Sequence, residues 1–567
     1  MKYKLSIKSL RVLGVTALML MGQSCKDTLN EVVVSNISSD YLSTPAGFQA
    51  AINSAYSSIR TFYGQERGLT MTEYGTDLYQ TGADGSYKGF HFYDSQLIGT
   101  VDIIQQVWEE LYKGINTCNA VIGRAATVAN TTDAIKKQRV AEAKFLRAHY
   151  YFILLQQFGP LDLRLTETLV PTKTAVRAPE ADIYKAIIAD LEASLPDLEN
   201  KAASSDYGRA TKAASESLLA KVYLTKATSS AKAADDYAKA ATYAQNVIAN
   251  YGFKLLPDFA SVFAQGAGEI SSEVIWSVQY TSDPLTNINS DNTVNSNGNN
   301  LHLLFGMQYD VQAGMQRDIV YDRPFKRLKP TTYLLETVFK DRVNDSRYKK
   351  TFRDTWLCNT AGGTFTNVFD NSKKSVTFKA GDTTIYIPGV EWTMAQRAAK
   401  PYQVLVPSLY SNSLFPTLVK FMDPLRPDKT YEAGSRDYLV FRLADTYLIL
   451  AEALIQQGKA ADAATAINMV RRRAAVPGKE SAMEITADQA TMDFLMEERA
   501  RELLGEQTRW LDLKRWGNLV SRVKLYNPDA APAIKETHNL RPIPQTQIDR
   551  SDKAANGSPG FPQNPGY

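Results

Sequence analysis

Apolar residues recur every three or four positions in several long stretches of this chain, most plainly within residues 438–474. Two runs with this spacing are separated by a polar break at 456–459. The apolar positions are Ala444, Tyr447, Leu448, Ala451, Leu454 and Ile455, then Ala463, Ala466, Ile467, Val470 and Ala474. Such spacing places apolar side chains on one face of an α-helix. The stretch therefore predicts two antiparallel helices, and its small residues and Gly-Lys break resemble a tetratricopeptide-type helix pair.

Three earlier parts of the chain show the same pattern. Their apolar faces lie at 48–62 with 107–122, 143–154 with 183–198, and 214–222 with 237–251. Each pair has no core until another pair packs on it, so the four pairs predict a stacked array. Two shorter helical segments follow the fourth pair. The sequence predicts helical pairs at about 44–251 and 436–517.

Between residues 252 and 435 the helical period is lost. Residues 273–278 alternate as a short strand does, and 376–378 with 385–387, around Gly381, predict a hairpin. The run 287–300 is too rich in Asn, Ser and Gly to form a core. The predicted fold class is mainly α: a tetratricopeptide-like helical-repeat superhelix with a loop-rich irregular half that contains short strands.

The N-terminus carries a processing signal. Four basic residues precede a short apolar run at 12–21, and Cys25 follows shortly after it. Because the run is too short to span a bilayer, it predicts a signal peptide over 1–24. The same four residues account for the formal charge of +4, so the mature chain is near neutral and no nucleic-acid partner is expected. No later stretch is apolar enough to cross a membrane. A small residue directly before Cys25 resembles a lipoprotein box, in which this cysteine becomes the acylated N-terminus. The alternative interpretation is an ordinary secretory signal with an incidental cysteine.

Five segments resemble the SusD/RagB family of outer-membrane nutrient-binding lipoproteins. They are AEAKFLRAHYYFILLQQFG at 141–159, RATKAASESLLAKVYL at 209–224, SRDYLVFRLADTYLILAEAL at 435–454, ERARELLGEQTRWLDLKRWG at 498–517, and LRPIPQTQID with the closing NPGY. The resemblance implies a lipid anchor on Cys25, a tether over 25–43 and a single body over 44–567. Lys26-Asp27 also resembles the tag that directs Bacteroidetes lipoproteins to the cell surface.

The resemblance implies a protein, lipid-anchored to the outer membrane and exposed at the surface, that captures an oligosaccharide or polysaccharide nutrient. It would deliver this glycan to a partner, a SusC-like TonB-dependent transporter. Two alternatives stay open: a RagB-like protein that binds peptides, and a helical-repeat scaffold that serves only protein partners.

The sequence offers little for catalysis. The histidines, His91, His149, His302 and His538, lack HExxH spacing, and neither a GxSxG elbow nor a GxxxxGK[ST] loop occurs. We therefore expect no enzyme activity, no cofactor and no metal site. Cys118 and Cys358 have apolar or aromatic neighbours and are expected to be buried thiols, although a disulfide between them stays open.

Two charged and aromatic motifs near the C-terminus are interpreted as structural. The acids Glu497, Glu498, Glu502 and Glu506 are expected to form salt bridges with Arg499, Arg501 and Arg509. Trp510 is expected to pack against the helical body, although a ligand platform is the alternative.

Sugar recognition needs flat aromatic faces and fixed polar groups, which usually lie on loops held by a rigid scaffold. Two loop regions, 64–99 and 281–323, meet this description. The predicted ligand-binding residues are Tyr74, Asp77, Tyr79, Tyr87, Asn299, Tyr309, Arg317 and Tyr321. The alternative is that these tyrosines only cover the irregular half.

Overall fold

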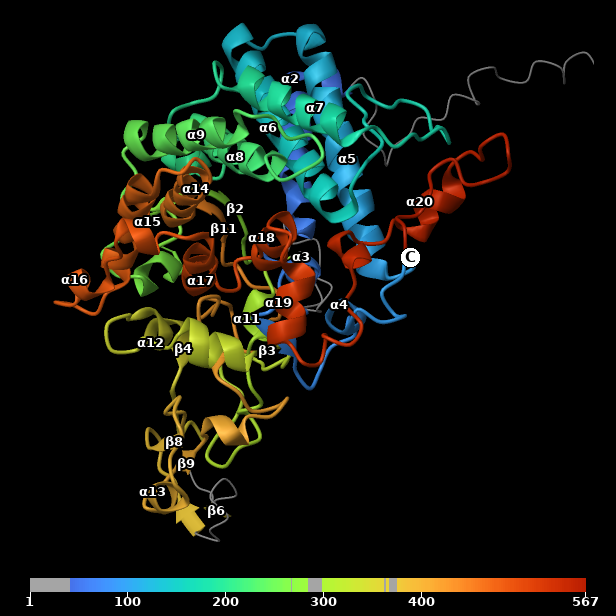
Figure 1. Ribbon diagram of the computed structural model, residues 1–567. Coiled ribbons are helices and arrows are strands. Elements are labelled where there is room, and N and C mark those ends of the chain that lie inside the picture. Colours follow the sequence, from blue (N-terminus) through green and yellow to red (C-terminus); the bar gives the residue numbers. More distant parts are fainter. Residues whose placement is uncertain (1–40, 267, 284–297, 361–363, 367–374) are drawn as a thin grey trace, which may run out of the picture.

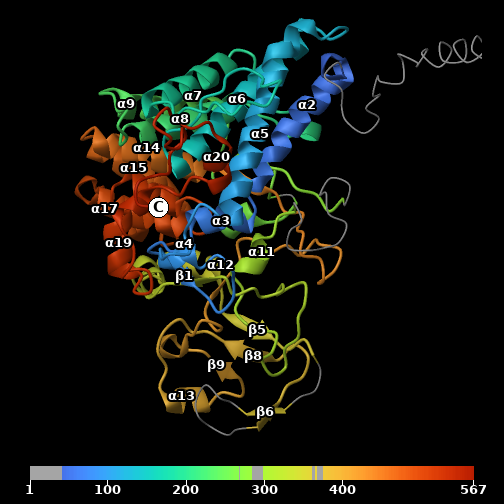
Figure 2. The same cartoon turned by 90° about the vertical axis from the view of Figure 1, so that its right-hand side faces the viewer.

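The computed structural model describes residues 41–567 except 267, 284–297, 361–363 and 367–374. The predicted signal peptide, Cys25 and nearly all of the tether lie outside the described residues. Helices form the upper part of the molecule in Figure 1, and a smaller lobe with strands projects at the other end in both views (Figures 1 and 2). The described residues therefore divide as predicted, into a helical half and an irregular half.

The four predicted helical pairs are present and stack in sequence order. They are α2 (Pro45–Ser58) with α5 (Asp102–Arg124), α6 (Asp133–Phe158) with α7 (Glu180–Ser194), α8 (Lys212–Lys226) with α9 (Asp236–Asn250), and α14 (Leu443–Gln456) with α15 (Ala460–Ala474). Helix α5 packs on α6, α7 on α8, and α9 on α14. The fourth pair thus continues the array directly, although the irregular half interrupts the sequence.

Threonine hydroxyls fix where several of these helices begin. Thr44, Thr132 and Thr211 each accept a hydrogen bond from a backbone N–H in the first turn of α2, α6 and α8. This satisfies one of the amides that every helix start leaves without a partner. Helix α6 ends at Gly159, whose φ of +74° is the left-handed conformation that favours glycine.

Strand β2 (Val274–Val278) connects the two halves. It pairs antiparallel with β11 (Tyr438–Arg442), which continues into α14, so that Tyr438 lies opposite Val278. Trp276 of this ribbon is buried and packs against His149 of α6. The ribbon is therefore part of the same core as the helices, and the predicted strand at 273–278 is confirmed.

The projecting lobe contains a three-stranded sheet of β5 (Thr355–Leu357), β8 (Thr383–Tyr386) and β9 (Gln403–Val404). Strand β8 pairs antiparallel with β5 and parallel with β9, whereas β7 (Ser375–Thr377) pairs with β6 (Thr364–Thr366). The predicted hairpin between 376–378 and 385–387 is wrong in its pairing. The strand at 383–386 is instead held between two partners distant in sequence.

Shorter elements complete the described chain. They are α3 (Glu66–Thr72), β1 (Tyr79–Thr81), α4 (Gly89–Phe92), α11 (Leu301–Leu304), β3 (Leu328–Pro330), α12 (Arg347–Thr351), β4 (Phe352–Arg353), α13 (Met394–Ala398), β10 (Thr417–Leu418), α16 (Glu480–Met483), α17 (Met492–Glu502), α18 (Arg509–Arg515), α19 (Leu519–Tyr526) and α20 (Gln545–Arg550), besides short 3-10 and π turns. Helices α17 and α18 confirm the two shorter helical segments predicted after the fourth pair.

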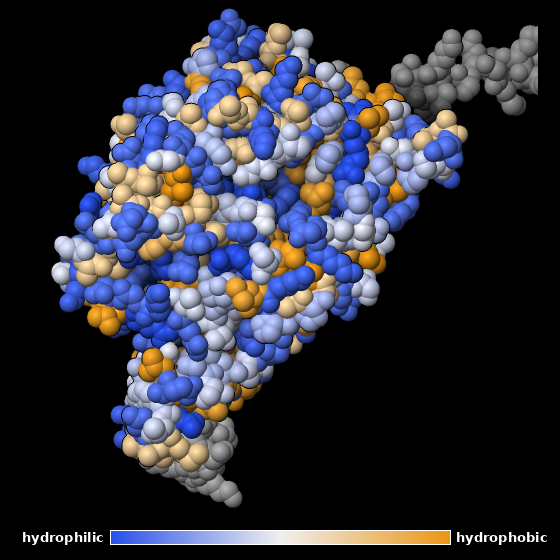
Figure 3. Space-filling model, viewed as in Figure 1, coloured by the Kyte–Doolittle hydropathy of each residue, from blue (hydrophilic) through white to orange (hydrophobic). Residues whose placement is uncertain are grey.

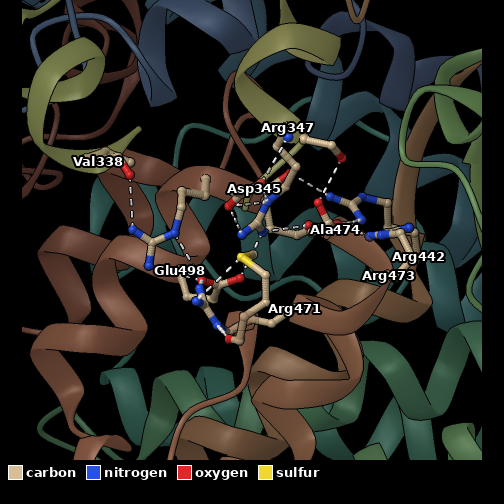
Figure 4. A network of polar contacts seen from close by, with 12 residues as sticks. Val338, Asp345, Arg347, Arg442, Arg471, Arg473, Ala474 and Glu498 are labelled. Carbon is tan, nitrogen blue, oxygen red and sulfur yellow. Dashed lines mark hydrogen bonds and ion pairs between the residues drawn. The ribbon is translucent and has the colours of Figure 1, made fainter. Parts of the chain in front are cut away.

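Two carboxylates of α17 lie at the centre of a buried ion network (Figure 4). Glu498 lies 2.8 Å from Arg347, and Glu502 lies 3.0 Å from Arg347 and 2.7 Å from Arg442. Arg473, at the end of α15, joins Glu502 to Glu273, the residue before β2. The network therefore connects α12, α15, α17 and the β2–β11 ribbon.

The partners of this network differ from those predicted. Arg499 pairs with Asp445 and Asp512, and Arg509 pairs with Asp77 rather than with the glutamates of its own segment. Of the three predicted arginines, Arg501 keeps its predicted partners, Glu498 at 3.0 Å and Glu497 at 3.5 Å. The periodicity of a single helix could not show this, because the charges are matched between segments distant in sequence.

The predicted structural role of Trp510 is confirmed. Its side chain is fully buried, and the guanidinium of Arg541 lies 4.3 Å from the ring centroid. The thiols of Cys118 and Cys358 are both free and buried, so these two cysteines do not form a disulfide with each other.

Replacing Glu502 with Gln should lower the free energy of unfolding by about 3–5 kcal/mol, because the variant leaves buried arginines without their counter-charge. Urea unfolding followed by circular dichroism measures this. Glu497→Gln is the matched control: Glu497 is on the same helix but is partly exposed and pairs only with Arg501, at 3.5 Å. The control should change stability by less than about 1 kcal/mol.

The wild type and Glu502→Gln also test how the free energy of unfolding depends on pH. Burial raises the pKa of Glu502, but the attraction of Arg473, Arg442 and Arg347 outweighs it and lowers this pKa to about 2. The ordinary value is about 4.3, so the contribution of Glu502 is complete above that pH and disappears as the pH falls towards 2. The stability difference between the wild type and Glu502→Gln should therefore shrink over this range. A constant difference would contradict the assignment.

Candidate functional site

The two predicted loop regions lie side by side in the structure, because the backbone amide of Asn300 donates to the carbonyl of Gly64 over 3.0 Å. Just after the second region, the chain also pairs with the first. Strands β1 and β3 pair antiparallel, with Tyr79 opposite Pro330 and Thr81 opposite Leu328. Beyond β1, the amide of Gly82 donates to the carbonyl of Arg327 over 2.9 Å. The early insertion is thereby held against the irregular half, and the exposed ends of both form one surface.

Buried amide side chains hold the same junction from within. The Asn300 side-chain oxygen accepts from the amide of Glu66 at 2.8 Å, and Asn299 donates to the carbonyl of Arg436 at 2.9 Å. Both asparagines are almost completely buried. A buried amide that satisfies backbone groups of several segments fixes their relative position, because breaking such bonds without water is costly.

The surface at this junction is polar, with rings beneath it. We call Asp84, Tyr87, Arg323, Phe325 and Arg327 the loop face. The Arg327 guanidinium lies 3.3 Å from Asp84, and the two arginine guanidiniums lie 5.0 Å from the centroid of the Phe325 ring. The Asp84 and Arg323 side chains are about half exposed, at 57% and 42%. The loop face thus presents both charge signs on an ordered base.

Tyr87 is the aromatic residue of the loop face in the early insertion. Its ring is half-buried, and its hydroxyl donates to Asp102 at 3.4 Å. Burial and the neighbouring Asp102 carboxylate raise the pKa of Tyr87 to about 12. The phenol therefore stays protonated at neutral pH and keeps a hydrogen for donation.

Most of the predicted ligand contacts are internal. Tyr74, Asp77, Tyr79, Asn299, Tyr309 and Tyr321 are buried, with exposed fractions between 0% and 8%. In this conformation these six side chains have almost no accessible surface for a sugar to contact, so their direct contact with a ligand stays a prediction. The alternative that they form part of the packing describes them better.

Their polar atoms have internal partners as well. Asp77 lies 2.7 Å from Arg509 and 2.8 Å from Arg522. The Tyr309 hydroxyl donates to the carbonyl of Asp322 at 2.5 Å. Aromatic and acidic composition alone could not separate the residues that build these loops from those on their surface.

Two predicted residues remain accessible, Tyr87 and Arg317, and Arg317 pairs with Asp310 at 2.9 Å. Sequence reasoning missed Asp84, Arg323, Phe325 and Arg327. The turn-forming run at 82–85, which carries Asp84 between glycines, was a signal for an exposed loop tip.

The described residues contain no group of three or more His, Cys, Asp and Glu side chains that could hold a metal ion. All four histidines are buried, and burial lowers the pKa of His149 to about 3. None of the described helices is long and apolar enough to cross a membrane. On the face shown in Figure 3, apolar residues are scattered among hydrophilic ones.

These features define a helical-repeat protein with a polar surface on ordered loops. Comparison with known proteins identifies the family within this class. The model of the SusD family matches residues 272–567, and a second model, described as starch-binding associating with outer membrane, matches residues 34–224. The chain belongs to the SusD family, and the predicted family and fold class are confirmed.

Relatives match over much of their length. SusD-like protein P2 of Formosa agariphila is 25% identical over 98% of both chains, and the starch-binding protein SusD of Bacteroides thetaiotaomicron is 24% identical over 77% of this chain and 74% of its own. Among solved structures, a laminarin binding SusD-like protein has a TM-score of 0.68 at 21% identity, covering 92% of this chain and all of that one.

The internal role of Tyr309 can be tested directly. Tyr309→Ala should lower the free energy of unfolding by about 3–5 kcal/mol, because it removes a buried aromatic side chain. Tyr87→Ala is the control on the accessible surface and should cost less than about 1 kcal/mol. Thermal and urea unfolding provide the measurement. Equal stability of the Tyr309 variant and the wild type would contradict burial.

Proposed function

We propose that this protein binds an oligosaccharide or polysaccharide nutrient at the cell surface and delivers it to a SusC-like TonB-dependent transporter in the outer membrane. Membership of the SusD family supports the proposal. So do relatives named for binding starch and laminarin, and a related surface glycan-binding protein solved in complex with laminarihexaose. We further propose that binding occurs without chemical turnover of the glycan.

The observation that carries the proposal is the chemistry of the loop face. Glycans present many hydroxyl groups, each of which donates and accepts, together with the apolar C–H faces of their rings. Asp84 accepts, Arg323 and Arg327 donate, and the half-buried ring of Tyr87 supplies an apolar surface. Buried residues hold this set in place, so little conformational entropy is lost on binding.

Tyr87 and Arg317 are the residues of the predicted site that we retain as glycan contacts. Tyr87 would stack on a sugar ring, and Arg317 would donate to hydroxyl oxygens or ring oxygens. Both are accessible, and both lie in the predicted loop regions, which meet at the hydrogen bond from Asn300 to Gly64.

Tyr87→Ala should weaken glycan binding by about 1–3 kcal/mol, by analogy with aromatic stacking on nucleic-acid bases. Titration calorimetry with the glycan selected on an array measures this loss. Tyr243→Ala is the matched control. Tyr243 is a half-exposed tyrosine on α9, stacked on Tyr223, and its loss should leave the affinity unchanged.

The array distinguishes the alternatives. Binding to peptides alone would replace the glycan proposal with peptide capture, and binding to neither would favour a scaffold for protein partners. Release of shortened product during incubation would contradict binding without turnover.

The mode of membrane attachment is a separate proposal. We propose that residues 1–24 are removed, that Cys25 carries the lipid, and that residues 25–43 tether a single body over 44–567. Cys25→Ala should move the protein from the membrane pellet to the soluble fraction, because a lipid chain supplies the apolar surface for attachment. A variant that stays in the pellet after a high-salt wash would contradict the anchor.

A further inference from the structure

A second concave site lies on the helical side of the β2–β11 ribbon. Its volume is about 530 Å³, within the range of roughly 300–1,000 Å³ that is usual for small-molecule sites. The walls come from residues 200–202, 207 and 211 before and at the start of α8, residues 251–253 after α9, and residues 269–272 and 274–277 around β2. None of these residues belongs to the loop face.

Two aromatic side chains form one wall. Tyr251 and Phe253 are half-buried, with ring centroids 6.4 Å apart and planes inclined by 46°. Gly252 turns the chain between them with a φ of +74°, and no other residue lies within 4 Å of the place where its Cβ would be. The turn thus opens towards space and leaves both rings accessible.

Polar groups line the rest of the cavity. The Ser271 hydroxyl is screened from bulk water and has no hydrogen-bond partner among the residues that the structure describes. Glu269 is held rigidly, because its two carboxylate oxygens accept from the amides of Asp437 and Gly266, each at 2.9 Å. Lys201 stands at the exposed rim.

This combination selects a ligand chemistry. A purely apolar ligand would leave the Ser271 hydroxyl without a partner, which is unfavourable for a buried polar group. A strongly charged ligand would meet both the ammonium of Lys201 and the carboxylate of Glu269. A neutral ring that carries hydroxyl groups satisfies both walls, with its C–H face on Tyr251 or Phe253 and its hydroxyls towards Ser271 and Glu269.

We propose that this cavity is a second carbohydrate-binding site, which holds one or two sugar units of a glycan. The inference rests on the proposed function, since it assigns the same ligand class to another part of the molecule. It adds that the protein contacts glycan at two separate places, so that two sugar segments are bound at once.

The test uses the full-length mature protein and starch and laminarin oligosaccharides of two to six units as probes. Tyr87→Ala serves as the background, so that binding at the loop face is weakened. Phe253→Ala then removes one wall, and Ala202→Trp fills the cavity from its rim without deleting a contact. Ala203→Trp is the matched control, because Ala203 is the neighbouring exposed residue and does not line the cavity. Melting temperatures verify folding, and Ala202→Trp alone suffices if Phe253→Ala is unstable.

We expect Phe253→Ala and Ala202→Trp to weaken the binding that remains in the Tyr87→Ala background by about tenfold or more, as for the loss of one stacking ring. Ala203→Trp should not change it. Unchanged affinity in the cavity variants, or no binding left in the background, would overturn the second site while leaving the proposed function intact. Failure of the wild type to bind any probe would instead overturn the proposed function, and the second site with it.

Discussion

Two buried carboxylates on α17 determine how the halves of this molecule meet. Glu498 and Glu502 have no exposed side-chain surface, and each is surrounded by guanidinium groups from other segments. A carboxylate removed from water is costly unless opposite charges replace its hydration. The α12 segment, the end of α15 and the start of α14 must therefore all be in place around α17. An apolar core alone would not fix the relative positions of these segments.

This constraint extends to the loops. Arg442 is the last residue of β11, and Glu273 precedes β2, so the network fixes the ribbon that connects the irregular half to the helices. Asp77 of the early insertion is held in turn by Arg509 and Arg522, just after α17. Because charge pairs position both sides of the β1–β3 junction, the loop face has an ordered base.

The periodic part of the fold could be predicted from the sequence, and the contacts between distant segments could not. Each helical pair was recognisable because a 3.6-residue period is a local property. Pairing of β8 with β5 and β9, and of Arg347 with Glu498, depends on residues far apart in the chain. The hairpin and the salt-bridge partners were wrong for this reason.

The same limit applies to single residues of the candidate site, because local sequence does not show which side chains distant segments bury. Tyr79 and Tyr87 have similar loop contexts in the sequence, yet the first is buried, with its ring centroid 5.4 Å from that of Phe305, and the second is accessible. A loop that presents a few side chains must itself be packed by many others of similar kind. The accessible residues Asp84, Tyr87, Arg317 and Arg323 lie at the edge of this packing, which is why we propose them, rather than the buried tyrosines, as the residues that set ligand preference.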